Sequence, residues 1–153
     1  MIKRLVDIVV AILALSMTWP LWLFTALLIK LDSPGPVFFT QSRIGRRFRP
    51  FRIYKFRPMV TGAEALGGPI TVGQDGRVTK VGRVLRRTKL DELPQLLNIL
   101  VGDMSLVGPR PEVLHYVELY RADFAEVLKV RPGLTDLASL KYIDEAALLQ
   151  GID

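Results

Sequence analysis

The stretch IVVAILALSMTWPLWLFTALLI, residues 8–29, decides the architecture of this chain, because it holds no charged residue over 22 positions. At a rise of ~1.5 Å per residue, a helix of this length just crosses a ~30 Å hydrocarbon core. No helical face of the run is polar, which argues against a buried core helix of a soluble protein. The run therefore predicts a membrane helix, which either spans the bilayer or enters and leaves through one leaflet.

The flanks and the centre of this run favour a helix that returns to the side from which it entered. By the positive-inside rule, basic residues at both ends place both ends in the cytoplasm; these residues are Lys3, Arg4 and Lys30. Pro20 removes the hydrogen bond to the Ser16 carbonyl and bends the helix. The hydroxyls of Ser16 and Thr18 can partly satisfy the freed backbone groups. We therefore expect a reentrant, non-spanning helix over residues 1–32, broken at Pro20.

A turn cluster at residues 32–36 (DSPGP) ends the apolar segment and begins the globular part, residues 33–153. Within this part, short strands are predicted near residues 37–39 and 51–56. Apolar residues at helical spacing predict a helix over residues 77–87, which either presents a solvated basic face or lies in the membrane interface. The fold class expected is α+β, mainly helical: a reentrant membrane helix, a small cytoplasmic domain and interfacial amphipathic helices.

The charge distribution indicates an anionic binding partner. Residues 1–90 hold 16 Lys and Arg against 4 acids, whereas residues 91–153 hold 5 against 11. Seven basic residues between residues 41 and 57 alternate with aromatic residues, which suits a lipid headgroup surface. The same pattern suits single-stranded nucleic acid, but such a binder has no use for the apolar run. We therefore expect a lipid bilayer as partner and no nucleic acid.

The candidate catalytic residues are Asp91 and Glu92, in the stretch LDELPQL at residues 90–96. A proline is tolerated only in the first turn of a helix, so Pro94 predicts a helix that starts near Asp91. Asp91 is then a candidate N-cap, and the helix N-terminus and preceding arginines are expected to keep it ionised, as a nucleophile requires. Glu92 points elsewhere, because neighbouring residues do not share a helix face. The two carboxylates therefore suit separate roles.

The remaining composition limits the chemistry further. The chain has no cysteine and one histidine, so thiolate zinc sites and cysteine nucleophiles are excluded. A metal bound here is expected to be a hard cation held by carboxylate and phosphate oxygens, with Mg²⁺ the default. Two arginines stand beside prolines, Arg110 in GPRP and Arg131 in VRPG. A fixed backbone presents a guanidinium to phosphate with little entropy to lose, although an ordinary structural turn is the better explanation of either motif taken alone.

In their order along the chain, these segments resemble the monotopic phosphoglycosyl transferases, a family of bacterial sugar transferases. The matching stretches span nearly the whole chain; they are KR with Asp7, SPGPVFF (33–39), Gln41 with Arg43 and Gly45, YKFR (54–57), LR (85–86), LDELPQ (90–95), GDMSLVGPRP (102–111) and VRPGLT (130–135). Where the family's helix break is usually Ser-Pro, Trp19 precedes Pro20 here, and the relieving hydrogen bond is left to Ser16 or Thr18.

The resemblance implies a ping-pong transfer of a phosphosugar from a nucleotide diphosphate sugar, such as a UDP-sugar, to polyprenol (undecaprenyl) phosphate. In this reaction Asp91 attacks the sugar-linked phosphate, nucleoside monophosphate leaves, and the lipid phosphate then takes the phosphosugar. Glu92 is the second member of the catalytic pair. Mg²⁺ is the family's metal, with Asp91 as its expected ligand. The substrate-phosphate positions are Lys55, Arg57, Arg86, Arg110 and Arg131.

The family also implies a place in the cell, the cytoplasmic face of the bacterial inner membrane, at the first membrane step of a glycoconjugate pathway. Family members usually continue for tens of residues beyond the length of this chain, so either a minimal form or one lacking the usual C-terminus is expected. The alternative function is a noncatalytic membrane-surface module that keeps the fold. Release of nucleoside monophosphate separates the two.

Overall fold

The computed structural model describes residues 2–63 and 75–136. Helices predominate, and the strands form two small sheets. The elements are α1 (Ile2–Asp32), β1 (Phe38–Ile44), η1 (Arg46–Phe48), β2 (Pro50–Phe56), α3 (Lys80–Thr88), η2 (Leu90–Glu92), α4 (Gln95–Val101), β3 (Ser105–Val107), α5 (Leu114–Leu119), α6 (Arg121–Val127) and β4 (Gly133–Thr135). The mixed, mainly helical class expected from the sequence is confirmed.

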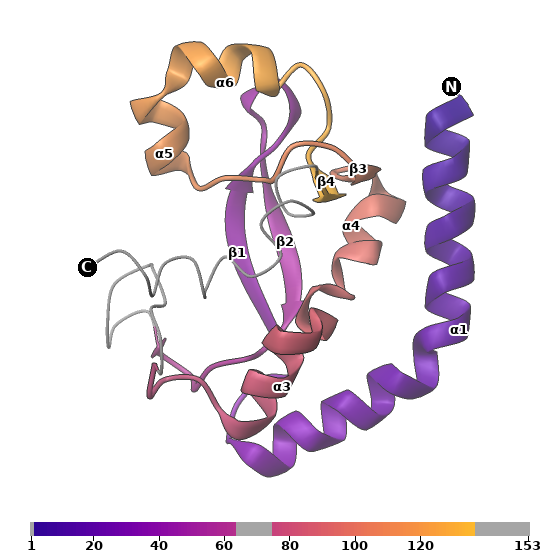
Figure 1. Ribbon diagram of the computed structural model, residues 1–153, viewed down its shortest axis with the longest axis vertical. Coiled ribbons are helices and arrows are strands. Elements are labelled where there is room, and N and C mark those ends of the chain that lie inside the picture. Colours follow the sequence, from indigo (N-terminus) through magenta and orange to yellow (C-terminus); the bar gives the residue numbers. More distant parts are fainter. Residues whose placement is uncertain (1, 64–74, 137–153) are drawn as a thin grey trace.

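Helix α1 is long and apolar enough to cross a membrane, by length and composition. Pro20 lies inside it, and Figure 1 shows the helix sharply bent near its middle, with both arms alongside the rest of the chain. The Ser16 hydroxyl donates to the Leu13 carbonyl and the Thr18 hydroxyl to the Ala14 carbonyl. They therefore bond the preceding turn instead of the Ser16 carbonyl that Pro20 leaves without its donor, and such bonds themselves favour a bend.

Both arms of α1 are tied to the globular part by buried or partly buried polar contacts. Near its start, Asp7 accepts hydrogen bonds from the Ser105 hydroxyl at 2.9 Å and the Leu106 N–H at 3.1 Å. At its end, Asp32 Oδ2 accepts a hydrogen bond at 2.9 Å from the Val81 N–H, in the first turn of α3. The two ends of one apolar helix are therefore attached to the same domain.

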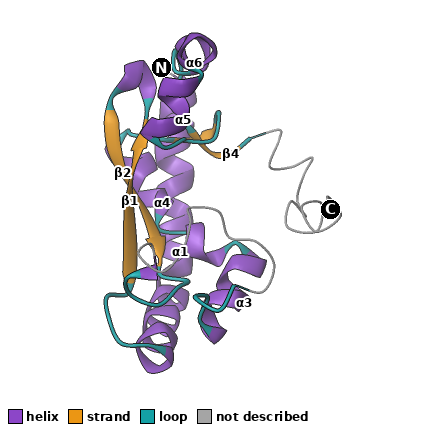
Figure 2. Ribbon diagram, turned by 90° about the vertical axis from the view of Figure 1, so that its left-hand side faces the viewer, coloured by secondary structure: helices purple, strands orange, loops and turns teal. Residues whose placement is uncertain are grey.

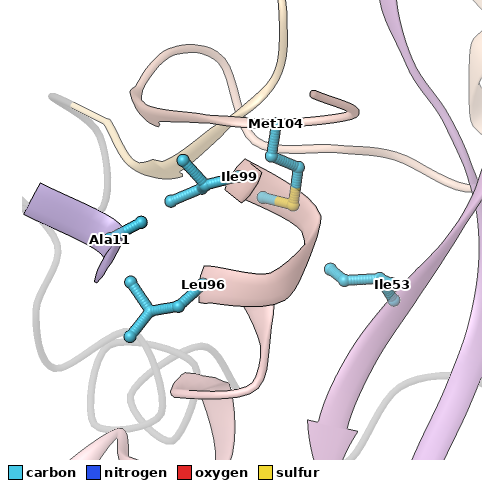
Figure 3. Packing of buried hydrophobic residues seen from close by; sticks show 5 residues of the cluster. All are labelled: Ala11, Ile53, Leu96, Ile99 and Met104. Carbon is cyan, nitrogen blue, oxygen red and sulfur yellow. The ribbon is translucent and has the colours of Figure 1, made fainter. Parts of the chain in front are cut away.

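The core consists of clusters in which each arm of α1 takes part. Figure 3 shows Ala11 of α1 facing Leu96 and Ile99 of α4, with Ile53 and Met104 on the other side of that helix. The second arm contributes Ile29, which packs with Phe56 and Leu85, and partly buried Trp22 joins them. Because α1 shares both clusters, it is part of the folded core as well as an apolar segment.

The β1–β2 hairpin is the longest sheet, with Phe38 opposite Phe56 and Ile44 opposite Pro50. It runs along one side of the molecule, next to α4 (Figure 2). Asn98 of α4 is fully buried and bonds two β2 backbone groups, accepting from the Tyr54 N–H and donating to the Arg52 carbonyl. The strands predicted at 37–39 and 51–56 are therefore the two halves of one longer hairpin.

The short parallel pair β3–β4 depends on a close backbone approach. A Cβ at Gly133 would lie 2.1 Å from the Gly108 backbone nitrogen, so only glycine fits. The pairing of Ser105 with Gly133 brings the GPRP loop and the RPG segment together across the strands.

Candidate active site

Asp91 lies in η2, the 3-10 turn between α3 and α4, and is 6% exposed. The expected N-cap role for Asp91 is wrong: α4 begins at Gln95, and Pro94 precedes it without a side-chain cap. The physical reason is that residues 90–92 form a separate tight turn, which directs the Asp91 side chain inward. Its Oδ1 atom is buried and makes no hydrogen bond to any residue that the structure describes.

The pKa of Asp91 also shifts in the direction opposite to the one expected from the sequence. Burial raises the pKa of the Asp91 carboxyl above its ordinary value, against the opposing charges of Lys55 and Arg86. A carboxylate at an exposed helix end stays hydrated, whereas the buried Asp91 carboxylate loses more hydration than these cations return. A carboxylate that is poorly solvated and short of hydrogen-bond donors is more reactive toward phosphorus once ionised.

Glu92 has the opposite environment, although it is the next residue. Its Oε1 accepts a hydrogen bond from Lys55 Nζ at 2.9 Å and lies 3.9 Å from Arg110 Nη2. Burial acts to raise the pKa of Glu92, but the charge and hydrogen bond of Lys55 and the charge of Arg110 together hold it below its ordinary value. The separate roles expected for the two carboxylates are therefore matched by separate surroundings.

Three elements bring Lys55, Glu92 and Arg110 together. Lys55 comes from β2, Glu92 from η2, and Arg110 from the loop after β3. All three line a surface pocket. The guanidinium of Arg110 is half-exposed and faces it as a candidate phosphate ligand.

The other basic positions expected at the phosphates lie in different surroundings. Arg86 acts on Asp91 through its charge and has no side-chain hydrogen bond within the described chain. Arg57 is 4% exposed, and its terminal nitrogens donate to the carbonyls of Ser33 and Pro34. Arg131 donates through Nε to the Gly102 carbonyl and lines a second pocket. The structure thus groups Lys55, Arg86 and Arg110 with the two carboxylates, and holds Arg57 inside the fold.

A divalent cation has a partial set of ligands here. The free Oδ1 of Asp91 is the type of oxygen that Mg²⁺ takes. Among residues 2–63 and 75–136, however, no group of three or more His, Cys, Asp or Glu could hold a metal ion by itself. The donor set fits Mg²⁺ if substrate phosphate oxygens and water complete its shell, which is how this ion usually binds.

The sequence assigned no role to several residues that position the site, although Arg43 and Asp7 stand among the stretches that match the family. Arg43 lines the pocket and donates to the Pro111 carbonyl, next to Arg110. Asn98 fixes α4 against β2, and Asp7 and Asp32 fix the ends of α1. A signal existed for the two aspartates, because each stands just outside the uncharged run of residues 8–29 and must find a partner near the apolar boundary.

Comparison with known proteins gives a consistent match over almost the whole chain. The model of a family described as bacterial sugar transferase matches residues 1–150. A UDP-N-acetylgalactosamine-undecaprenyl-phosphate N-acetylgalactosaminephosphotransferase of Aeromonas hydrophila is 47% identical over 144 residues, which cover 92% of this chain and 34% of that protein. A UDP-glucose:undecaprenyl-phosphate glucose-1-phosphate transferase of Caulobacter vibrioides is 47% identical, covering 91% and 53%. An exopolysaccharide production protein of Rhizobium leguminosarum is 45% identical, covering 92% and 74%.

Proposed function

Since this chain belongs to the bacterial sugar transferase family, we propose that it transfers a phosphosugar from a UDP-sugar to undecaprenyl phosphate and releases uridine monophosphate. The names of the Aeromonas and Caulobacter relatives describe transfers of this type. This chain corresponds to only 34% and 53% of those two proteins, so the activity is proposed here on the strength of its own site as well.

The observation that carries the proposal is the buried Asp91 carboxylate with a free Oδ1, beside a cluster of cations. In the first step an Asp91 oxygen attacks the phosphorus that bears the sugar, and the bond from that phosphorus to the bridging oxygen breaks. The bridging oxygen leaves with uridine monophosphate. In the second step an oxygen of undecaprenyl phosphate attacks the same phosphorus, and the Asp91 carboxylate is released.

The cations stabilise the negative charge of the phosphate groups during the transfer. Phosphoryl transfer depends mainly on positioned cations and an in-line nucleophile. Arg86 has no side-chain hydrogen bond within the described chain, and the half-exposed Arg110 lies 3.9 Å from Glu92, whereas Lys55 is hydrogen-bonded to Glu92 at 2.9 Å. Arg86 and Arg110 are therefore better placed than Lys55 to turn to the diphosphate. Asp91 would hold Mg²⁺ together with substrate phosphate oxygens, and the ion would supply further neutralisation of the leaving group. Glu92 keeps Lys55 in place and remains ionised to assist the lipid acceptor.

Asp91→Asn tests the nucleophile. We expect it to abolish uridine monophosphate release and any covalent adduct seen by mass spectrometry when a panel of UDP-sugars is added without acceptor. Glu92→Gln should lose turnover with undecaprenyl phosphate, while its adduct with donor survives. Asp123→Asn removes an exposed carboxylate on α6 and is the matched control, which should keep full activity. An Asp91→Asn protein that still turns over would refute the proposal, and absence of any turnover in the unmodified chain would favour the noncatalytic membrane module.

We also propose that α1 is reentrant and that the protein works at the cytoplasmic face of the bacterial inner membrane. The support comes from the contacts at the two ends of the helix. A helix that spans the bilayer has its ends on opposite sides, whereas Asp7 and Asp32 both form hydrogen bonds with the same domain. The outer face of α1 exposes large apolar side chains to the surroundings, among them Met17, Leu23 and Phe24. Exposed Val84 on α3 and Leu119 on α5 suit helices that lie at the interface.

Single cysteines test this topology, because the chain has none of its own. Ile2→Cys and Thr40→Cys lie at exposed positions before and after the apolar run. In intact cells, an impermeant thiol reagent should label neither, and both should react after lysis. Labelling of one site but not the other in intact cells would establish a spanning helix.

A further inference from the structure

A second pocket lies at the tip of the β1–β2 hairpin, and neither the resemblance nor the proposed reaction uses it as a unit. Its lining includes four arginines and one carboxylate; these residues are Arg46, Arg47, Arg49, Arg131 and Asp103. It shares no lining residue with the pocket that holds Lys55, Glu92 and Arg110. An excess of positive charge in a concave surface attracts an anion.

The pocket is held in place by the surrounding backbone. Arg46 Nε donates to the Lys129 carbonyl at 2.9 Å, and Arg131 Nε donates to the Gly102 carbonyl at 2.7 Å. The Arg47 N–H donates to the Leu128 carbonyl at 2.8 Å. The hairpin tip is therefore anchored on the segment after α6, and the arginine side chains start from fixed positions.

The tip also carries local backbone strain. Arg47 and Phe48 both have left-handed conformations, with φ of 58° and 59°. This conformation is unfavourable for a non-glycine residue, and such strain collects at ligand-binding sites. The guanidinium of Arg121 lies 4.7 Å from the centre of the Phe48 ring and supports this turn.

Free hydrogen-bond donors remain on all four arginines. Arg47 and Arg49 have no side-chain hydrogen bond or ion pair within the described chain, and Arg46 and Arg131 use only Nε in the bonds above. A guanidinium with free terminal nitrogens pairs bidentately with phosphate. The chemistry of the pocket thus fits a phosphate group better than an isolated carboxylate, which one arginine would satisfy.

The position of the pocket indicates where the phosphate comes from. Gly102 follows α4, and Arg4 at the start of α1 bonds the Ile99 and Leu100 carbonyls in the last turn of α4. A Cβ at Gly102 would lie 3.3 Å from the Arg4 guanidinium and 4.0 Å from that of Arg131. The pocket is therefore beside the N-terminal end of the apolar helix, which is at headgroup level when α1 is inserted in a bilayer.

We propose that this pocket binds the phosphate of an anionic phospholipid headgroup and so fixes the domain on the membrane surface. The proposal rests on insertion of α1, but not on the chemistry at Asp91. A soluble phosphate, including that of a nucleotide, offers the same chemistry from another source, and the experiment below separates the two.

Native mass spectrometry of the full chain in neutral detergent, titrated with phosphatidylglycerol or phosphatidylcholine, tests this site. We expect phosphatidylglycerol to bind at least tenfold more tightly. Arg47→Gly with Arg49→Gln should lower its affinity at least tenfold, and Gly accepts the left-handed backbone at position 47 without strain. Arg52→Gln with Arg83→Gln, the same loss of two exposed charges elsewhere, should change the affinity less than twofold.

Each remaining outcome has a defined meaning. Equal affinity for the two lipids, or equal losses in the two double variants, would overturn the site in favour of diffuse surface charge. Inorganic phosphate or uridine monophosphate that displaces phosphatidylglycerol at equal concentration would overturn the lipid as the source. Asp91→Asn should bind phosphatidylglycerol normally, so that a failure of the proposed reaction leaves this result intact. A cooperative thermal transition in each variant confirms that it is folded.

Discussion

Asp91 and Glu92 are adjacent carboxylates with opposite electrostatic roles in the folded chain. Burial raises the pKa of Asp91, so its ionisation destabilises the fold increasingly as the pH rises through that raised pKa. Asp91→Asn should therefore raise the free energy of unfolding by roughly 1 kcal/mol at pH 8, by removing a buried charge whose Oδ1 has no hydrogen-bond partner among the described residues. The gain should vanish below about pH 4, where the carboxyl is protonated in both states. Thermal unfolding in detergent measures both.

Glu92→Gln should shift stability in the other direction. The lowered pKa of Glu92 means that its ionised form stabilises the fold above about pH 4.3, and that this contribution is lost as the pH falls through the lowered value. Removing its charge leaves the partly buried Lys55 ammonium without its partner, which should cost roughly 1–3 kcal/mol at neutral pH. Equal shifts in Asp91→Asn and Glu92→Gln would contradict the two environments described here.

Arg110 should act on phosphate more than on folding, because its guanidinium is half-exposed and its flanking prolines fix the backbone. Arg110→Lys keeps the charge but loses the planar fork, so activity should fall at least roughly tenfold, equivalent to ~1.4 kcal/mol in the barrier, with the melting temperature unchanged. Arg52→Lys, at an exposed position on β2, is the control and should be silent. Similar activity in the two variants would remove Arg110 from the site.

At the scale of elements, the bend in α1 and its two attachments should depend on one another. Pro20→Leu restores a backbone donor and favours a straight helix, but straightening pulls either Asp7 or Asp32 from its partner. Pro20→Leu alone should therefore convert only a minority of molecules to the spanning form, as measured by labelling of Ile2→Cys. Adding Asp32→Ala should increase that fraction more than the sum of the two single changes. Additive effects would mean that the Asp32 contact does not oppose spanning.

What the sequence could predict at this scale is the local pattern. The apolar run and its proline, the hairpin strands and the two adjacent carboxylates all follow from neighbouring residues. The burial of Asp91 could not be predicted, because it depends on a separate 3-10 turn before α4. Nor could the bonds of Lys55 to Glu92 and of Asn98 to β2, because they join residues 37 to 46 positions apart. A motif therefore identifies the type of residue at a site, whereas tertiary packing determines which distant residue becomes its hydrogen-bond partner.

On the scale of the whole molecule, α1 should be required for folding as well as for membrane attachment. It supplies Ala11 to one core cluster and Ile29 and Trp22 to another, so its removal uncovers their partners on α4 and β2. Loss of each large buried side chain costs about 1.5–3 kcal/mol, and a domain has only about 5–15 kcal/mol of stability.

Residues 33–153 expressed without α1 should therefore lack a cooperative thermal transition and exchange the amide hydrogens of α4 and β2 rapidly. The full chain in detergent, which keeps both clusters, is the control and should show slow exchange in the same segments. Addition of detergent to the shortened chain should not restore protection, because detergent covers apolar surface but does not replace the Asp7 and Asp32 hydrogen bonds. If the shortened chain instead unfolds cooperatively and its amide hydrogens exchange slowly, α1 serves only as a membrane anchor. The Asp7 and Asp32 contacts would then no longer support the placement of both ends of α1 on one side of the membrane.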